Sequence, residues 1–401
     1  MPELLASTPV HPPRRRLQRA GKALELAWRR GVFRVLAGAI WVRDRLPRGA
    51  RAEGPMRVLF LRPDRIGDMV VTTGVLRAIG GAPGLVMDVL AAPANAAVLA
   101  SEPAVRAVLV LDRKRFAAMR RVVREARAQN YDVIVDCMPT APSVTMLMIM
   151  LAIGARRRVG TSGRGLDHIL DPATPSLPLE SHIVDHLSLL VPPFRPDHAT
   201  LDLAPVLVLS EVERVGGALV WTNTFSGNND ASCGTALRLL VNISAGKAAR
   251  WWPASHYAEV INEARAVEPS LQVLIMAAPH EGDRAQELAD LVGAPIAPTG
   301  SLRAAFAVAG AADVVFTPDT SIAHAAGALG VPVVDMLLEG KASGWGVYRT
   351  RGENLESPTD ELVSLSPTEP AAALVRVLRA VRQSVVSAGT EPALTSPQAA
   401  S

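Results

Sequence analysis

Residues 57–61 (RVLFL) run directly into residues 62–69 (RPDRIGDM) and then into residues 70–79 (VVTTGVLRAI). A short apolar run followed by a loop with proline and glycine is typical of a buried strand and the turn that ends it. The longer, mostly apolar stretch that follows is typical of a helix. The folded part of the chain is therefore predicted to begin with a strand, a loop and a helix.

The same alternation recurs along the chain. Further strands are predicted at residues 85–90, 107–111 and 132–136, with helices at 93–100, 115–129 and 142–153. A second series has strands at 239–243, 272–276, 314–317 and 331–336, with helices at 254–267, 281–292, 301–311 and 320–329. Strands that alternate with helices build parallel, doubly wound sheets. The predicted fold class is therefore α/β, with two Rossmann-like domains that face each other across a cleft.

The length of 401 residues and a hydrophobic fraction of 49% are enough for two such cores. We predict a basic N-terminal extension (1–55), a first domain (56–205), a linker (206–236) with a polar, loop-like stretch (222–234), a second domain (237–365), a C-terminal helix (366–388) and a disordered tail (389–401). The C-terminal helix could cross back to the first domain. The two cysteines, Cys137 and Cys233, are too few for a disulfide framework or a cysteine zinc site, and we expect incidental thiols in a reducing cytoplasm.

The N-terminal extension carries the excess positive charge. Residues 1–56 contain twelve Arg or Lys and four acidic residues, for a net charge of +8, whereas the remaining 345 residues sum to −4. An amphipathic helix is predicted at about 14–46, because apolar residues recur there on one side at helical spacing: Leu17, Leu24, Trp28, Val32, Val35, Val42 and Leu46. Such a helix either lies on an anionic lipid surface or packs on the protein body, and both interpretations stay open. Nucleic acid is not an expected partner, because proteins that bind nucleic acid usually carry their positive charge on the folded domain.

No apolar run is long enough to cross a bilayer. The longest, residues 143–154, has about a dozen residues, against the ~20 that a spanning helix needs. The run at 35–42 is too short for a secretory signal and is not followed by a small-residue cleavage site. We therefore expect a protein that stays in the cytoplasm, and an N-terminal helix on anionic lipid would make it peripheral on a membrane.

Polar motifs follow the predicted strands, where open α/β sheets bind ligands. In the first domain this loop contains Arg62, Asp64, Arg65 and Gly67, and Gly67 permits a tight turn and close backbone approach. Asp68 stands at the start of the next helix. It either caps that helix or presents a carboxylate that takes a proton from an acceptor hydroxyl.

Two loops of the second domain suit a nucleotide diphosphate. Residues 242–253 (NISAGKAARWWP) combine Ser244 with the cations Lys247 and Arg250. They either bind a diphosphate or form a solvated basic loop, and they lack the spacing of a Walker loop. Glu281, in residues 278–281 (APHE), either holds two ribose hydroxyls or only favours a helix start.

A third loop, residues 317–327 (TPDTSIAHAAG), leads into a helix that is predicted to begin near Thr320. The N–H groups of Thr320 and Ser321 would lie at the helix start, which is a favourable place for phosphate. Asp319 is suited to accept hydrogen bonds from sugar hydroxyls. His324 lies one turn into the helix, on the face of Thr320, and is either a ligand or a structural histidine.

Four segments together resemble glycosyltransferase family nine, the lipopolysaccharide heptosyltransferases: residues 62–79 (RPDRIGDMVVTTGVLRAI), 242–253, 278–289 (APHEGDRAQELA) and 313–332 (DVVFTPDTSIAHAAGALGVP). The resemblance covers about residues 56–340 and implies a GT-B fold. It implies an inverting transfer from a nucleotide sugar, typically ADP-heptose, to the inner core of a lipid A precursor on the cytoplasmic leaflet, with no cofactor. The roles it implies are general base for Asp68, donor-phosphate ligand for Arg250, sugar and phosphate ligands for Asp319 and Thr320, and ribose ligand for Glu281.

Two features depart from the family. Arg250 stands where members commonly have lysine, and a guanidinium sets a different phosphate geometry. Residues 337–345 (LLEGKASGW) replace a loop that often contains Gly-Pro. They leave the sugar and the base open, so a GT-B enzyme with another nucleotide sugar and a non-catalytic nucleotide-sugar-binding relative remain alternatives. No Asp-x-Asp pair is present, so the sequence does not require a metal.

Overall fold

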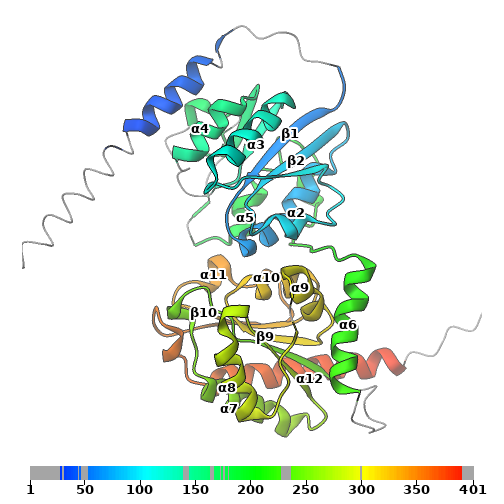
Figure 1. Ribbon diagram of the computed structural model, residues 1–401. Coiled ribbons are helices and arrows are strands. Elements are labelled where there is room, and N and C mark those ends of the chain that lie inside the picture. The colour runs from blue at the N-terminus through cyan, green and yellow to red at the C-terminus, as the bar shows by residue number, and fades with distance from the viewer. Residues whose placement is uncertain are drawn as a thin grey trace, which may run out of the picture.

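The computed structural model describes residues 28, 31–43, 45–46, 53–138, 144–162, 167–171, 173–174, 177–178, 180–226, 236–298 and 300–390. The parts of the predicted N-terminal helix and tail at 14–27 and 391–401, and Cys233, lie outside these residues. Two α/β domains stand one above the other in Figure 1, the N-terminal domain above and the C-terminal domain below.

The N-terminal domain contains a parallel sheet in the order β3-β2-β1-β4-β5-β6. Its strands are β1 (Met56–Arg62), β2 (Leu85–Ala91), β3 (Ala107–Val110), β4 (Val133–Asp136), β5 (Arg157–Thr161) and β6 (Ala173–Thr174). Its helices are α2 (Ile66–Gly80), α3 (Phe116–Ala128), α4 (Val144–Ile153) and α5 (Ile183–Ser188). The strand order reverses between β1 and β4, so the loop after β1 lies where such sheets bind ligands.

The C-terminal domain contains a parallel sheet in the order β11-β10-β9-β7-β8. Its strands are β7 (Arg238–Asn242), β8 (Gln272–Met276), β9 (Val314–Pro318), β10 (Val333–Leu337) and β11 (Glu353–Glu356). Its helices are α7 (Ala254–Val267), α8 (Gly282–Val292), α9 (Leu302–Gly310), α10 (Ser321–Ala328), α11 (Ala342–Trp345) and α12 (Thr368–Thr390). The order reverses between β7 and β9, which places the two loops predicted to bind phosphate side by side.

The two domains share a continuous apolar cluster that includes Val58 and Val75 from the first domain and Phe306 and Ala325 from the second. Because α2 packs on α10, the two helices that begin at the ligand-binding edges meet at the interface. Polar contacts also cross it: His182 Nε2 lies 2.8 Å from the carbonyl oxygen of Gly346. The predicted pair of facing Rossmann-like domains is therefore confirmed.

The segment 206–236 differs from the linker that the sequence predicted. Residues Glu211–Phe225 form a helix, α6, whose side chains pack on α9. Trp221 of this helix is fully buried and its Nε1 donates to the carbonyl oxygen of Val308 at 3.0 Å. Residues 227–235 lie outside the described part of the chain.

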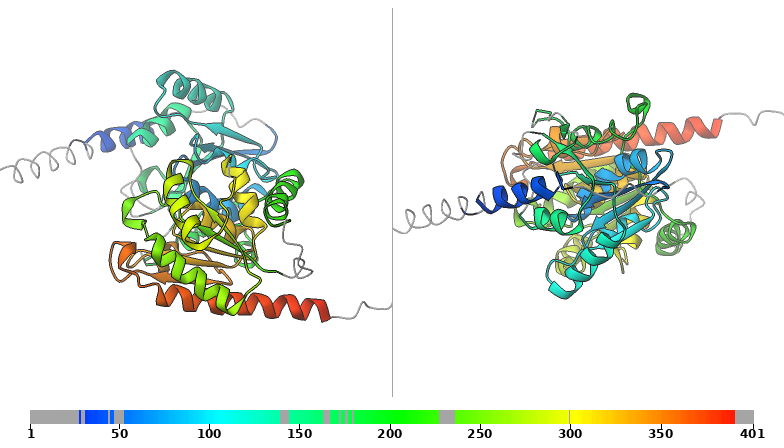
Figure 2. Two further views of the ribbon diagram at one scale, coloured as in Figure 1. Left: turned by 60° about the horizontal axis from the view of Figure 1, so that its bottom comes forward. Right: turned by 90° about the horizontal axis from the view of Figure 1, so that it is seen from above.

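The C-terminal helix α12 does not cross back to the first domain. It packs on α7 and against β9, β10 and β11 of its own domain. In Figure 1 and in the left view of Figure 2 it lies on the side of the C-terminal domain that faces away from the N-terminal domain. The reason is its apolar stripe, which includes Leu374 and Leu378 and completes the C-terminal core.

Residues 31–43 of the N-terminal extension form a helix that packs on the first domain. Ala37 and Ile40 are buried in an apolar cluster with residues of β1, α3 and α4, and Phe33 and Leu36 pack beside them. These side chains lie on a different side of the helix from the predicted apolar side. Among the described residues, no helix is long and apolar enough to span a bilayer.

Candidate active site

The first turn of α2, which contains Gly67 rather than leaving it in the predicted loop, touches the start of α10 across the domain interface. A Cβ atom built on Gly67 would lie 3.1 Å from His324 Cδ2 and 3.7 Å from Ser321 Cα. The distance to Ser321 is an ordinary contact, whereas the distance to His324 is short, so glycine at position 67 leaves room for the His324 ring. The contact joins the predicted acceptor loop to the predicted phosphate-binding helix.

The buried side chain of Arg62 stabilises the loop after β1. This side chain, predicted to line the acceptor side, is instead buried, with 1% exposure. Its Nε donates to the carbonyl oxygen of Asp68 at 3.0 Å, and its Nη1 donates to Asp64 Oδ2 at 3.3 Å. Burial raises the pKa of Asp64. Arg62 thus supports the shape of the loop, whereas Arg65 is exposed.

Asp68 is not the N-cap of α2, because the helix begins two residues earlier, at Ile66. Its carboxylate reaches back to the helix start, where Oδ2 accepts from the backbone N–H of Arg65 at 3.2 Å. Arg62 Nη2 lies 3.9 Å from Oδ1. The carboxylate keeps an exposed side, with 18% side-chain exposure, while these two contacts set its direction.

On the other side of the interface, Arg250, Asp319 and His324 form a compact charged cluster. Arg250 Nη2 lies 2.6 Å from Asp319 Oδ2, and Arg250 Nη1 donates to the Asp319 carbonyl oxygen at 2.5 Å. His324 Nε2 lies 3.5 Å from Asp319 Oδ1. Burial opposes ionisation of Asp319, but the His324 hydrogen bond and the charge of Arg250 outweigh it and lower its pKa. Arg65 of the N-terminal domain adds to this lowering.

Arg250 retains hydrogen-bonding capacity beyond its contacts with Asp319. Its Nε is buried and has no hydrogen-bond partner among the described residues. Because a guanidinium has five N–H groups in a fixed plane, Asp319 orients Arg250 and leaves donors for an anionic ligand. Lys247, three residues before Arg250 in the same loop, is exposed.

Ser244 and Glu281 connect the loops that follow β7 and β8. Ser244 Oγ accepts from the backbone N–H of Ala278 at 2.7 Å. Glu281 is 5% exposed, and its Oε1 accepts from the Ala245 N–H and from Arg284 Nη1, both at 3.1 Å. Its Oε2 is buried with no hydrogen-bond partner in the described part of the chain. This oxygen therefore retains unused hydrogen-bond acceptor capacity.

A buried polar row lies beneath these loops. Asn242, on β7, donates from Nδ2 to Thr317 Oγ1 at 2.8 Å and to Thr320 Oγ1 at 3.2 Å. Thr320 is the N-cap residue of α10, but its hydroxyl makes no capping bond. Because that hydroxyl is engaged by Asn242, the start of α10 is not closed by its own side chain.

The row continues to Asp335 on β10, which pairs in register with Thr317. Asp335 is fully buried, and neither carboxyl oxygen has a hydrogen-bond partner in the described structure. Burial, followed by the charge of Asp319, raises the pKa of Asp335 well above its usual value. The carboxyl therefore stays protonated to higher pH than an ordinary aspartate and adds less negative charge beneath the cluster.

Three residues of the site were not predicted from the sequence: Asn95, Asn242 and Asp335. Asn95 is fully buried, and its Nδ2 donates to the Arg62 carbonyl oxygen at 2.8 Å and lies 3.3 Å from that of Asp64. A polar residue at the end of an apolar run, as in residues 238–242 (RLLVN), was the available signal for Asn242. An acid inside 333–337 (VVDML) was the signal for Asp335.

Comparison with known proteins now identifies the family. The model of glycosyltransferase family 9 (heptosyltransferase) matches residues 119–362. The chain belongs to glycosyltransferase family 9. A comparison with curated protein sequences found no match.

Solved structures of family 9 enzymes share the fold. The family 9 glycosyltransferase of Veillonella parvula is 16% identical, with a TM-score of 0.67 over 84% of this chain and 100% of that one. ADP-heptose lipopolysaccharide heptosyltransferase II of E. coli is 18% identical, with a TM-score of 0.61 over 82% and 100%. E. coli heptosyltransferase WaaC, solved with ADP, is 18% identical, with a TM-score of 0.59 over 81% and 100%. The GT-B fold of this family 9 chain is thus established.

The family match covers the three loops of the C-terminal domain but not the loop of Gly67 and Asp68. The position of that loop comes from the structure, through its contact with α10. Sequence similarity and tertiary contact therefore support the two halves of the candidate site separately.

Proposed function

We propose that this family 9 glycosyltransferase moves a heptose from ADP-heptose to a lipopolysaccharide core or a related glycolipid acceptor, with inversion at the anomeric carbon. The contact of Gly67 with His324 carries this proposal, because it brings the carboxylate of Asp68 to the same interface as the Arg250 cluster. The ADP in the WaaC structure supports an adenine nucleotide as the donor carrier.

In the proposed reaction, Asp68 accepts the proton of an acceptor hydroxyl as that hydroxyl attacks the anomeric carbon of the donor. The bond to the nucleoside diphosphate breaks, and the sugar is transferred in a single displacement. The N–H of Arg65 and the charge of Arg62 keep the carboxylate aimed while it works.

Negative charge that develops on the leaving diphosphate is stabilised by Arg250 and by the N-terminal end of α10 at Thr320 and Ser321. Lys247 is close in sequence and exposed, so it can approach the same phosphates. The unpartnered Oε2 of Glu281 is suited to a ribose hydroxyl, and Asp319 to a sugar hydroxyl. No metal or resident cofactor enters this scheme.

The proposed acceptor is lipid-linked, which suits an enzyme that is peripheral on the inner face of the inner membrane. The net charge of +8 on residues 1–56 supports an anionic surface as the partner. The packing of residues 31–43 on the first domain fixes part of this basic extension to the acceptor domain.

Asp68→Asn tests the catalytic assignment. Transfer of sugar from ADP-heptose should fall by at least about a hundredfold, because general-base catalysis contributes roughly 10²–10⁴. Donor affinity, measured by calorimetry, should stay within about twofold, since the donor groups lie on the other domain. Undiminished transfer by this variant refutes Asp68 as the base.

A further inference from the structure

The helix at residues 31–43, which we call the leader helix, has two apolar sides, and only one is covered. Phe33, Leu36, Ala37 and Ile40 pack on the protein. Four other apolar side chains are exposed, with fractions of 66% for Trp28, 72% for Val35, 54% for Val42 and 57% for Leu46. Val35 and Val42 lie seven residues apart and so on one side of this helix, and Trp28 and Leu46 stand seven residues before and four residues after them in the chain. A helix that only packs on its own domain would carry polar residues there.

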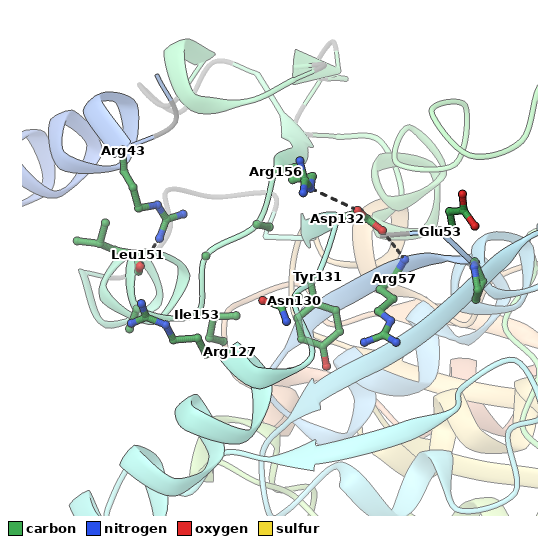
Figure 3. A pocket seen from close by; sticks show the side chains of 14 residues that line it. Arg43, Glu53, Arg57, Arg127, Asn130, Tyr131, Asp132, Leu151, Ile153 and Arg156 are labelled. Atoms are coloured by element: carbon green, nitrogen blue, oxygen red, sulfur yellow. Dashed lines mark hydrogen bonds and ion pairs between the residues drawn. The ribbon is translucent and has the colours of Figure 1, made fainter. Parts of the chain in front are cut away.

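A cavity of about 660 Å³ opens beside the end of this helix. It lies at the amino ends of β1, β4 and β5, whereas the candidate active site follows the carboxyl ends of the strands. Its lining includes Arg43 from the leader helix, Arg57 from β1, Arg127 from α3, and Asp132 and Arg156 from the loops before β4 and β5. Figure 3 shows Arg43 reaching towards Leu151 from the leader helix, and Arg156 and Arg57 on either side of Asp132.

The cavity has an excess of positive charge. Four arginines line it, against the carboxylates of Glu53 and Asp132. Arg156 Nε lies 3.7 Å from Asp132 Oδ1. Arg57 Nη1 donates to the carbonyl oxygen of Gln129 at 2.8 Å, a bond that orients the guanidinium without cancelling its charge. Arg127 is exposed.

Arg43 connects the cavity to the exposed apolar stripe of the leader helix. It donates to the carbonyl oxygen of Leu151 in the last turn of α4, where a cation is favourable. Its guanidinium also lies against Gly154, 2.9 Å from a Cβ atom built there. The end of the leader helix is therefore anchored at the rim of the cavity, with Val42 and Leu46 on its exposed side.

We propose that this cavity binds the phosphate of an anionic lipid head group while the exposed stripe of the leader helix enters the adjoining interfacial layer. The inference extends the proposed membrane-associated function and names the surface that meets the lipid. An excess of guanidinium groups in a cavity suits a phosphate. An apolar stripe directly beside it suits a bilayer surface rather than a soluble anion.

Vesicle binding by the full chain tests the cavity. Vesicles of phosphatidylcholine, with and without a quarter phosphatidylglycerol, are the probes. Arg57→Gln with Arg127→Gln should weaken binding to the anionic vesicles by about 25-fold, since each basic residue near the surface contributes about fivefold. Arg351→Gln with Arg379→Gln removes the same charge from exposed positions on the C-terminal domain, and should weaken binding by less than about threefold. Equal losses in the two pairs overturn the inference.

Charge-preserving variants guard against a folding artefact. Arg57→Lys with Arg127→Lys should retain most of the binding, with an unchanged melting temperature in all pairs.

Val35→Ser with Val42→Ser should lower binding by about tenfold or more, because two exposed apolar side chains no longer enter the lipid. Wild-type binding by that variant overturns the inference.

The same experiment separates this inference from the proposed function. Asp68→Asn should bind vesicles as the wild type does, while the cavity pair should transfer sugar normally to a short, lipid-free acceptor. If the wild-type chain transfers no sugar, the proposed function fails, and vesicle binding still decides whether the cavity holds lipid.

Discussion

Substituting Gly67 with alanine inserts one methyl group between the two domains at the candidate active site. The new Cβ would lie 3.1 Å from His324 Cδ2. Carbon atoms in ordinary contact are about 3.5–4.0 Å apart, so the Gly67 backbone and the His324 ring must separate by about 0.4 Å or more. A misplacement of about 1 Å can cost about a hundredfold in rate. Scaled in free energy, a shift of about 0.4 Å corresponds to about 1 kcal/mol and a five- to tenfold lower kcat.

The assay is steady-state transfer from ADP-heptose, carried out as a double-mutant cycle with His324→Ala. Because alanine at 324 removes the atom that the new methyl group meets, Gly67→Ala should cost little in that background. Gly216→Ala, on α6 with no atom within 4 Å of the added Cβ, is the control and should leave kcat unchanged. A wild-type kcat for Gly67→Ala, or the same loss in both backgrounds, contradicts the close approach of α2 and α10.

Three further predictions concern stability. Gly216→Ala should raise the melting temperature, because alanine favours a helix by up to about 1 kcal/mol over glycine. Gly217→Ala should lower the melting temperature, because its Cβ would overlap the backbone of α9. Equal shifts in the two variants would contradict the α6–α9 contact. Burial and then the charge of Asp319 raise the pKa of Asp335 well above its ordinary value of about 4. Between the ordinary pKa and the raised pKa, the unfolded chain releases a proton that the folded state keeps. The free energy of unfolding therefore falls as pH rises above about 4. The melting temperature of Asp335→Asn relative to wild type should therefore increase from pH 4 to pH 8, and a constant difference would refute the assignment. The Arg303 hydrogen bonds lower the pKa of Glu213 to about 2. The stabilisation of the folded state by these bonds is therefore present above about pH 4.5 and lost as pH falls towards 2. Glu213→Gln should lower the melting temperature at pH 7 and make it depend less on acid pH, which thermal unfolding measured across pH would reveal.

The central strands were predictable from the sequence because strands buried on both faces are continuous apolar runs. The run at residues 57–61 and the run at residues 272–276 both became strands, β1 and β8. The edge strand β11 (ENLE) was missed because it lacks such a run. Helix α6 was missed although Ser210 and Glu213 form a capping box at its start, a local signal that was available.

The loops that carry polar site residues were also predictable, since each follows an apolar run and contains glycine, proline or a charged residue. What each residue does within the loop was not. Arg62 and Arg65 are equally basic in the sequence, yet one is buried inside the loop and the other is exposed. The difference arises from Asp64, Asp68 and Cys137, which surround Arg62 only after the chain has folded.

The amino-acid sequence by itself determined the alternation of strands and helices, the two-domain α/β class and the positions of the candidate ligand loops, because these follow from local apolar patterns and turn residues. The tertiary structure alone decided that Gly67 meets His324, that Asp335 lies buried beside Asp319, and that the N-terminal helix covers Ile40 and exposes Val35. Each of these depends on surfaces contributed by residues distant in the chain, and helical or strand periodicity carries no information about which partner such a surface will meet.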